Sequence, residues 1–307
     1  MSNLLRAGVR RYIRNIVFWA ALFVTSIVAI IASDAARSYY FDDIYCTIVF
    51  VSFAVFISCL VGNENEEGIF RNKVVSGYTK GQVYISELIL GVSACLIMFF
   101  IFVLVFIAFN SYVFTKAPLF ACFEILLDSL FVHICSAIIL ITISCLVSKR
   151  AIIAVINIVL ILAMVCGSYV CQSVVEQEKY YLEYKYEETV ITDEFGTHLT
   201  SVPIDGSAYP VENPYYIDGP IRVVAETFYD ILPYGHMTEY ISLTTDWFGY
   251  ENYGDSGHNN SSWETSAKVT LPQYAEKEIR INLTWSAIII VAIFIVGFIS
   301  FRKKDLR

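Results

Sequence analysis

Six long stretches without a charged residue constrain this chain more than any other feature of its sequence. Each holds 18 to 28 residues, and they cover 16–33, 44–62, 88–115, 129–148, 151–175 and 283–301. A helix of about 20 apolar residues crosses the hydrocarbon core of a bilayer. Charged residues make up only 16% of the chain, against about 25% in soluble domains. The sequence therefore predicts an all-α polytopic membrane protein with six transmembrane helices, and it excludes a soluble enzyme, a disordered chain and a secreted disulfide scaffold.

The distribution of Lys and Arg predicts which side of the membrane each loop faces. Six spans place both termini on one side, and cytoplasmic loops carry an excess of basic residues. With the termini inside, 13 of the 21 Lys and Arg fall on short cytoplasmic segments, whereas the short outer loops carry only Arg37 and Lys116. We therefore expect cytoplasmic N- and C-termini in a multi-pass protein of the plasma membrane.

The segment 172–281, between the fifth and sixth spans, differs in composition from the rest. It holds 19 Asp and Glu against six Lys and Arg, a net charge of −13, and 13 of the 21 Tyr. Strands are expected at 180–184 and 189–192, turns at Asp205-Gly206 and Asp218-Gly219, and an amphipathic helix at 221–232 with Val224, Phe228 and Ile231 on one face, lying against the membrane or the domain core. We expect an extracytoplasmic α+β domain here. It would separate a membrane domain at 1–171 from a sixth span and basic cytoplasmic tail at 282–307.

Four polar residues within or beside the spans are candidates for a function inside the membrane. Intramembrane ionisable side chains are functional candidates by default, but His133 and Asn157 are each expected to hydrogen-bond a neighbouring helix. Glu124 and Asp128 have the i, i+4 spacing that a proton relay would use. Their depth favours a solvated outer extension of the fourth span, so no ion pathway is predicted.

The sequence holds no catalytic or nucleotide-binding motif that we recognise. HExxH, GxSxG and GxxxxGK[ST] are absent, and the eight cysteines, all between residues 46 and 171, lack metal-ligand spacing. The short basic clusters beside the spans suit contact with membrane lipid rather than nucleic acid. We expect no enzyme activity, metal or cofactor in this chain and no nucleic-acid partner.

The loop between the second and third spans, residues 62–82, is the most informative segment. Asn65 is a candidate helix N-cap, with Glu66 and Glu67 in the first turn, where the helix dipole favours anions. Gly77 suits a left-handed cap at the end of the same helix. The pattern predicts a short cytoplasmic helix of about 11 residues.

A capping box follows this short helix. Thr79 and Gln82 have the spacing at which each side chain bonds the backbone N–H of the other, which starts the next helix. Two spans need only a short turn to be joined, so a capped helix between them suggests a role. It either docks a cytoplasmic partner or rests on lipid as an interfacial helix.

The same loop resembles a known family. Glu67-Gly68-Ile69-Phe70-Arg71-Asn72-Lys73 and the following Ser76 to Tyr84 are similar to the pattern E-x-G-T-I-R-N-K-L-x-x-G-x-S-R-x-Q-I-Y of type-2 ATP-binding-cassette (ABC) transporter permeases. The likeness is greatest to permeases of monoderm bacteria that export bacteriocins or lantibiotics or protect against them. The chain departs from the pattern at Phe70 and at Thr79-Lys80. The resemblance extends to the basic N-terminal elbow, the six spans, the stretch 232–235 and the tail 301–305.

The resemblance implies a permease subunit that pairs with a second permease, as a homodimer or heterodimer, and binds a separate ATPase subunit. ATP and Mg²⁺ would then be bound by that ATPase. The substrate would be exported or cleared from the membrane, and we expect a cationic or antimicrobial peptide. The residues that would contact and couple to the ATPase are Glu66, Glu67, Gly68, Ile69, Phe70, Arg71, Asn72 and Lys73, with Gly77 and Tyr78 as the helix cap.

Two other classes of function remain compatible with the residues. A membrane sensor or immunity protein would bind a ligand through the 172–281 domain without transporting it. An intramembrane enzyme ranks last, because no catalytic constellation supports it. A permease should co-purify with a soluble ATPase that carries a Walker-A loop, and a sensor should not.

Overall fold

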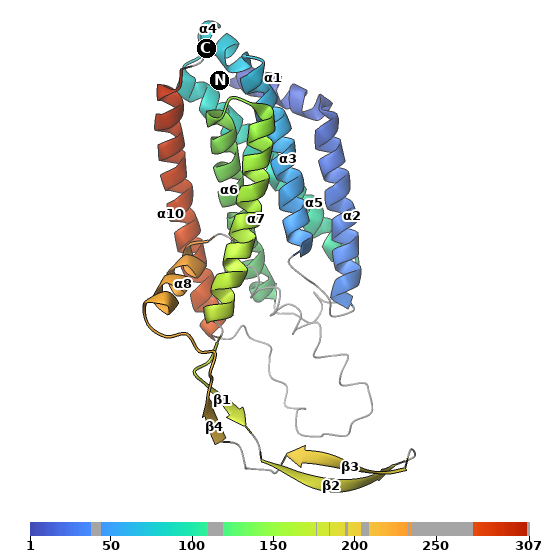
Figure 1. Ribbon diagram of the computed structural model, residues 1–307. Helices are drawn as coiled ribbons and strands as arrows, with labels where there is room; N and C mark the ends of the chain where they lie inside the picture. Colours follow the sequence, from blue (N-terminus) through green and yellow to red (C-terminus); the bar gives the residue numbers. More distant parts are fainter. Residues whose placement is uncertain are drawn as a thin grey trace. The chain divides into compact units, whose positions relative to one another are not determined.

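The computed structural model describes residues 1–37, 44–109, 119–175, 177–183, 185–193, 196–203, 209–232, 234 and 273–305. Helices dominate this part of the chain (Figure 1). In chain order the elements are α1 (Ser2–Arg14), α2 (Ile16–Arg37), α3 (Ile44–Glu66), α4 (Ile69–Val75), α5 (Lys80–Phe109), α6 (Leu119–Leu146), α7 (Arg150–Val175), β1 (Tyr180–Glu183), β2 (Tyr186–Asp193), β3 (Gly196–Pro203), β4 (Tyr209–Glu212), α8 (Pro220–Ile231) and α10 (Gln273–Lys303).

Six of the described helices are long and apolar enough to cross a membrane. The candidate spans are Ile16–Asp34 in α2, Thr47–Glu66 in α3, Lys80–Phe109 in α5, Leu126–Leu146 in α6, Arg150–Val175 in α7 and Arg280–Lys303 in α10. Each overlaps one of the six uncharged stretches. The prediction of a multi-pass membrane protein with six spanning helices is confirmed at this level of length and composition.

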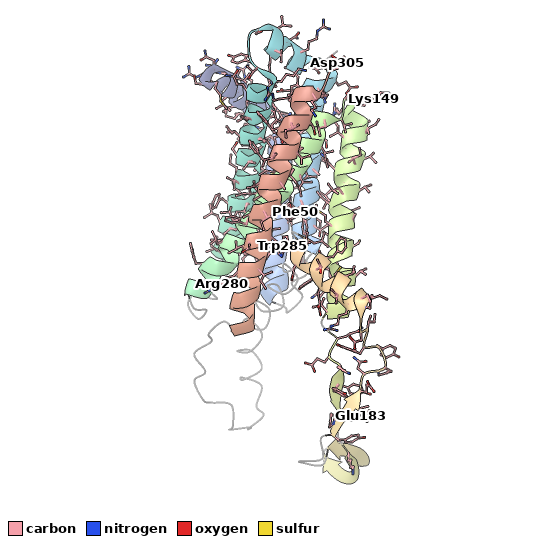
Figure 2. The ribbon with its side chains drawn as sticks, turned by 90° about the vertical axis from the view of Figure 1, so that its left-hand side faces the viewer. Phe50, Lys149, Glu183, Arg280, Trp285 and Asp305 are labelled. Carbon is pink, nitrogen blue, oxygen red and sulfur yellow. The ribbon has the colours of Figure 1, made fainter. Side chains whose placement is uncertain are left out.

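The chain divides into two compact units. One comprises Met1–Tyr169 together with Tyr229–Arg307, and the other comprises Val170–Phe228. The larger unit holds the helical bundle. Its two ends can be followed in Figure 2, where Lys149 and Asp305 lie at one end and Arg280 lies towards the other. In Figure 1, α1 and α4 lie at the same end as the two chain termini. The basic segments predicted to be cytoplasmic therefore share one end of the bundle.

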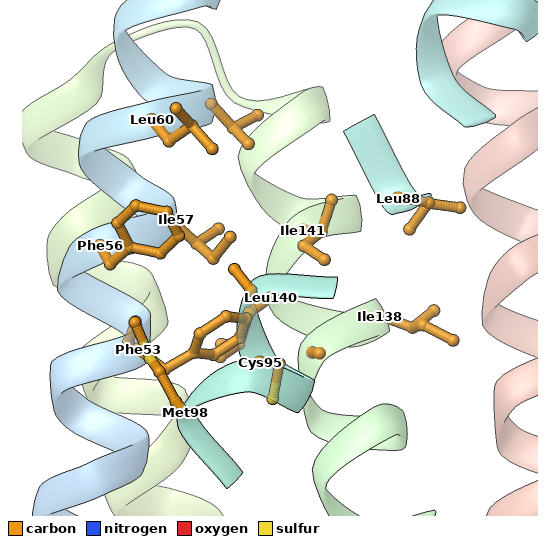
Figure 3. Close-up of a cluster of buried hydrophobic side chains, with 14 of the residues drawn as sticks. Phe53, Phe56, Ile57, Leu60, Leu88, Cys95, Met98, Ile138, Leu140 and Ile141 are labelled. Carbon is orange, nitrogen blue, oxygen red and sulfur yellow. The ribbon is translucent and has the colours of Figure 1, made fainter. Parts of the chain in front are cut away.

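The core of the bundle is a cluster of apolar side chains, and Figure 3 shows the part of it that α3, α5 and α6 contribute. A Cβ atom at Gly91 would overlap the side chain of Ile141. The absence of a side chain at Gly91 therefore lets α5 approach α6 closely, as small residues do in membrane helix pairs. The labelled members of the cluster are Phe53, Phe56, Ile57 and Leu60 on α3, Leu88, Cys95 and Met98 on α5, and Ile138, Leu140 and Ile141 on α6.

The Val170–Phe228 unit contains two antiparallel ribbons, β1 with β4 and β2 with β3. Both predicted strands are confirmed, since β1 covers residues 180–183 of the expected 180–184 and 189–192 lies inside β2. Glu183 pairs with Tyr209 across the first ribbon, and the Tyr209 hydroxyl donates to the Glu183 carboxylate at 2.9 Å. This hydrogen bond raises the pKa of Tyr209 above its ordinary value, because losing the phenolic proton would remove the donor and place two anions together.

The predicted amphipathic helix at 221–232 is confirmed as α8. It follows a turn at Gly219, which has a φ of +80° and donates its N–H to the Asp218 side chain at 2.7 Å. Val224 and Phe228 on its predicted apolar face are 53% and 55% exposed, so they join no core within the described residues. The expected turn at Asp205-Gly206 lies outside the described residues, as does 235–272.

Candidate functional site

The loop 62–82 folds into a short helix with a defined break on each side. α3 continues through Glu66, Gly68 adopts a left-handed backbone with a φ of +69°, and α4 then runs for seven residues. The prediction that Asn65 caps an 11-residue helix is therefore wrong. The Asn65 side chain is used elsewhere, because it donates to the backbone carbonyl of Val147 after α6.

The predicted C-terminal cap of α4 is confirmed. Gly77 has a φ of +97°, its N–H bonds the carbonyl of Val74 at 3.0 Å, and the N–H of Tyr78 bonds the carbonyl of Lys73 at 3.3 Å. This pair of bonds is the Schellman motif, which satisfies the last carbonyls of a helix. A residue with a Cβ atom would strain this backbone. Gly77 therefore fixes where α4 ends.

The predicted capping box is confirmed as well. The N–H of Gln82 bonds the Thr79 hydroxyl at 3.2 Å, and the N–H of Thr79 bonds the Gln82 side-chain oxygen at 3.0 Å. The two bonds satisfy orphan donors at the start of α5. The end of α4 and the start of α5 are thus both fixed by local signals that the sequence specifies.

One face of α4 carries a buried ion cluster. Lys73 donates to Glu64 on α3 and to Glu87 on α5, the second contact being 2.6 Å. The side chains of Glu64 and Glu87 are only 3% and 1% exposed. Arg11 on α1 also pairs with Glu64, so two cations balance two carboxylates and the cluster is neutral. Breaking a buried pair by removing one partner costs about 3–5 kcal/mol.

An aromatic contact anchors the same face. Phe70 is 1% exposed, and its ring meets Phe301 of α10 edge to face at 5.6 Å. Tyr84 of α5 also stacks on Phe301, with ring centroids 5.7 Å apart, and its hydroxyl lies 2.9 Å from that of Thr142 on α6. Burial of a Phe side chain contributes about 1.5–3 kcal/mol. α4 is therefore joined to α5 and α10.

The end of the chain adds a third attachment. Lys304 donates to the Asn65 side-chain oxygen at 2.9 Å and to the carbonyl of Cys145 at 2.8 Å. Lys80 donates to the carbonyl of Lys304 at 2.6 Å. Burial lowers the pKa of Lys304, because the charged form loses hydration. These bonds join the tail to both ends of the loop 62–82.

The opposite face of α4 is exposed. Arg71, Asn72 and Val75 all lie on this side, and Val75 is 79% exposed although its side chain is apolar. We call these three residues the α4 outer face, and we call Phe70 and Lys73 the α4 anchor. Single exposed apolar residues are ordinary on protein surfaces. Val75, however, is the last residue of a helix whose other face is fixed to the bundle.

The ten residues predicted from the family resemblance separate between the two faces. Of the set, Glu66, Glu67, Arg71, Asn72 and Gly77 are exposed, Gly68, Ile69, Lys73 and Tyr78 are half-buried, and Phe70 is buried. Sequence reasoning missed Glu64 and Glu87. The only available signal was that each stands next to an uncharged stretch, where a lone charge of a spanning helix needs a partner.

The prediction that Asn157 hydrogen-bonds a neighbouring helix is confirmed. Its amide donates to the hydroxyls of Ser58 on α3 and Ser144 on α6, at 3.1 and 3.0 Å. Asn157 is fully buried. Such bonds between membrane helices contribute about 0.6 kcal/mol on average. Asn157 therefore stabilises the packing of α7 on two neighbours.

Among the described residues, the His133 ring bonds its own helix and not a neighbouring helix as predicted. Its ring nitrogen lies 2.7 Å from the carbonyl of Ser129, one turn earlier on its own helix. Neighbouring helices instead supply the rings of Phe50 and Phe99, with centroids 4.3 and 4.6 Å from the imidazole. The residue is held by packing between α3 and α5.

The expected solvation of Asp128 is wrong. Asp128 is fully buried and accepts a hydrogen bond of 2.7 Å from Asn282 on α10. Sequence distance from the end of the fourth span does not reveal that α10 covers this face of α6. The Glu124 side chain lies outside the described residues.

Within the described residues, no group of three or more His, Cys, Asp or Glu is placed to hold a metal ion. Nor does any protein-family model, curated protein or solved structure match the chain.

Proposed function

We propose that this chain is the permease subunit of an ABC transporter, with α4 docking a separate ATPase subunit that binds ATP and Mg²⁺. The observation that carries the proposal is the two-faced construction of α4. One face is fixed to the bundle through Phe70 and Lys73, and the other presents Arg71, Asn72 and Val75 outward. A helix that only connected two spans would need no such attachment.

The α4 anchor determines which helices would move if a docked partner displaced α4. Lys73 contacts α3 and α5 at once, and Phe70 contacts α10. Packed helices switch between discrete arrangements as rigid bodies rather than deforming continuously. Nucleotide-driven closure of the ATPase would therefore move the ends of three spanning helices together, provided that the two conformations bind the outer face differently.

The charge pattern supports the proposed topology and substrate, and the family resemblance supports a second permease. The basic end of the bundle would face the cytoplasm, and 172–281 would form the extracytoplasmic domain. A second permease would complete the translocation path. The acidic, Tyr-rich composition of 172–281 suits a cationic peptide as the substrate that is exported or cleared from the plasma membrane.

The test is co-purification of the full chain with a soluble ATPase that carries a Walker-A loop, encoded beside it. Arg71→Glu reverses a charge on the α4 outer face and should weaken the association at least about tenfold, which corresponds to about 1.4 kcal/mol. Lys149→Glu makes the same change at an exposed position at the same end of the bundle, and should leave the association intact.

Both variants should elute as monodisperse protein, because neither substitution touches a buried contact. Retention of the ATPase by Arg71→Glu would reject α4 as the docking element. If no ATPase co-purifies with the wild-type chain, the chain is better explained as a membrane sensor or immunity protein whose outer domain binds a ligand without transport.

A further inference from the structure

α1 packs on the bundle through one of its faces only. Leu4, Gly8 and Tyr12, spaced four residues apart, are its buried positions. A Cβ atom at Gly8 would overlap Leu90 of α5, so the helix lies directly against that span. The Tyr12 ring meets Phe18 of α2 at 4.4 Å. These contacts fix the rotation of α1 about its axis and so determine which residues its other faces present.

Two further stripes run along the exposed side of α1. Arg6, Arg10 and Arg14 repeat every four residues and lie opposite the packed face, and Val9 and Ile13 form an apolar stripe beside them. Val9 and Ile13 are 39% and 48% exposed. No described acidic side chain pairs with any of the three arginines. The basic stripe and the apolar stripe therefore lie side by side on the exposed surface of α1.

The position of α1 along the chain places these stripes at the membrane boundary. α1 ends at Arg14, and the first candidate span begins at Ile16. Trp19, 54% exposed in the first turns of that span, donates its indole N–H to the carbonyl of Ile13 at 2.7 Å. Trp is enriched at the level of the lipid headgroups. The C-terminal turn of α1 is thus bonded to a residue typical of that level.

We propose that Arg6, Arg10 and Arg14 form a binding site for the headgroups of anionic phospholipids, with Val9 and Ile13 entering the acyl boundary below them. The guanidinium groups supply charge-assisted hydrogen bonds to phosphate oxygens. Helices with a basic stripe next to an apolar stripe lie in the membrane interface. Charge complementarity selects acidic lipids over zwitterionic ones. This lipid site requires no ATPase, so its test is independent of the proposed transport function.

The experiment uses the full chain in lipid nanodiscs with Trp19 as its only tryptophan, through Trp247→Phe, Trp263→Phe and Trp285→Phe. Quenching of Trp19 fluorescence is compared between brominated phosphatidylglycerol and brominated phosphatidylcholine. At low salt we expect at least about a fivefold preference for phosphatidylglycerol. The preference should shrink towards one at 1 M salt, where the Debye length falls to about 3 Å.

Three charge variants identify the residues responsible. Changing Arg6, Arg10 and Arg14 together to Gln should abolish the preference, and changing them to Lys should retain most of it, which shows that the helix still folds. The matched control removes three exposed charges from the same end of the bundle, through Lys149→Gln, Arg302→Gln and Lys303→Gln, and should keep the preference.

Equal quenching by the two lipids in the wild-type chain would overturn the proposal. A control variant that loses the preference as fully as the α1 Gln variant would overturn it too, because a general surface charge would then explain the effect. If the α1 Gln variant keeps its lipid preference but loses a protein partner, the arginines bind a protein instead.

Discussion

Replacing Lys73 with Met should destabilise the protein far more than the small change in side-chain volume suggests. The substitution keeps most of the apolar stem but removes the charge between Glu64 and Glu87, whose side chains are 3% and 1% exposed. The cluster changes from neutral to one net negative charge, with only Arg11 left beside Glu64. Removing one partner of a buried pair costs about 3–5 kcal/mol, so we expect the free energy of unfolding to fall by that amount.

A double-mutant cycle isolates the ionic part of this effect. Glu87→Gln in the Lys73→Met background restores neutrality and keeps a polar group of similar shape. We expect it to recover about half or more of the loss, giving an interaction energy within the range of about 0.5–3 kcal/mol seen for contacting residues. The control is Arg71→Met, which makes a comparable change on the exposed face of the same helix and should stay within about 0.5 kcal/mol.

The assay is reversible unfolding in mixed micelles by sodium dodecyl sulfate, followed by far-ultraviolet circular dichroism. The reasoning is refuted if Lys73→Met costs no more than Arg71→Met. It is also refuted if Glu87→Gln adds a further loss to that of Lys73→Met instead of relieving it, because the carboxylate would then not depend on the lysine.

Three further predictions concern the α4 anchor, the topology and the segment 172–281. Phe70→Ala should cost about 3–5 kcal/mol in the same unfolding assay, whereas Phe70→Leu should cost less than about 1.5 kcal/mol; equal losses would mean that the contact with Phe301 is not tightly packed. Protease added to intact protoplasts should cut within 172–281 and spare 62–82, and cleavage of the loop instead would invert the topology. The full chain in nanodiscs should bind a basic amphipathic peptide more tightly than a neutral one at 0.1 M salt and lose this difference at 1 M; binding that ignores salt would reject an electrostatic substrate site.

The sequence predicts the elements whose signals are local. Charge-free stretches define the six spanning helices because the bilayer sets their length. The positive φ of Gly77 and the capping box of Thr79 and Gln82 were predicted because each involves residues within one or two turns of each other. The same holds for the strand β1 and the helix α8, which follow from short patterns of apolar residues.

The interactions that the sequence does not reveal connect residues far apart in the chain. Asn65 looks like an N-cap in a local window, but its amide bonds the carbonyl of Val147, 82 positions later. Asp128 looks solvated until Asn282 of α10 is placed beside it, 154 positions away. Propensity and spacing cannot anticipate such a partner, because it is the packing of helices that chooses it.

We propose that the ion cluster of Lys73, Glu64 and Glu87 also transmits movement, in addition to stabilising the fold. Well-packed apolar side chains in place of a buried ion pair are often neutral or stabilising, so α4 could be held without Lys73. What the lysine adds is a simultaneous link to α3 and α5, through which a push on the α4 outer face would reach both helices. The Lys73→Met, Glu87→Gln variant separates the two roles, because it regains stability without regaining that link. If α4 docks an ATPase as proposed, this variant should bind that ATPase as the wild-type chain does but show weaker substrate stimulation of ATP hydrolysis. Normal stimulation in a stable double variant would instead assign the transmission of movement to the packing of Phe70.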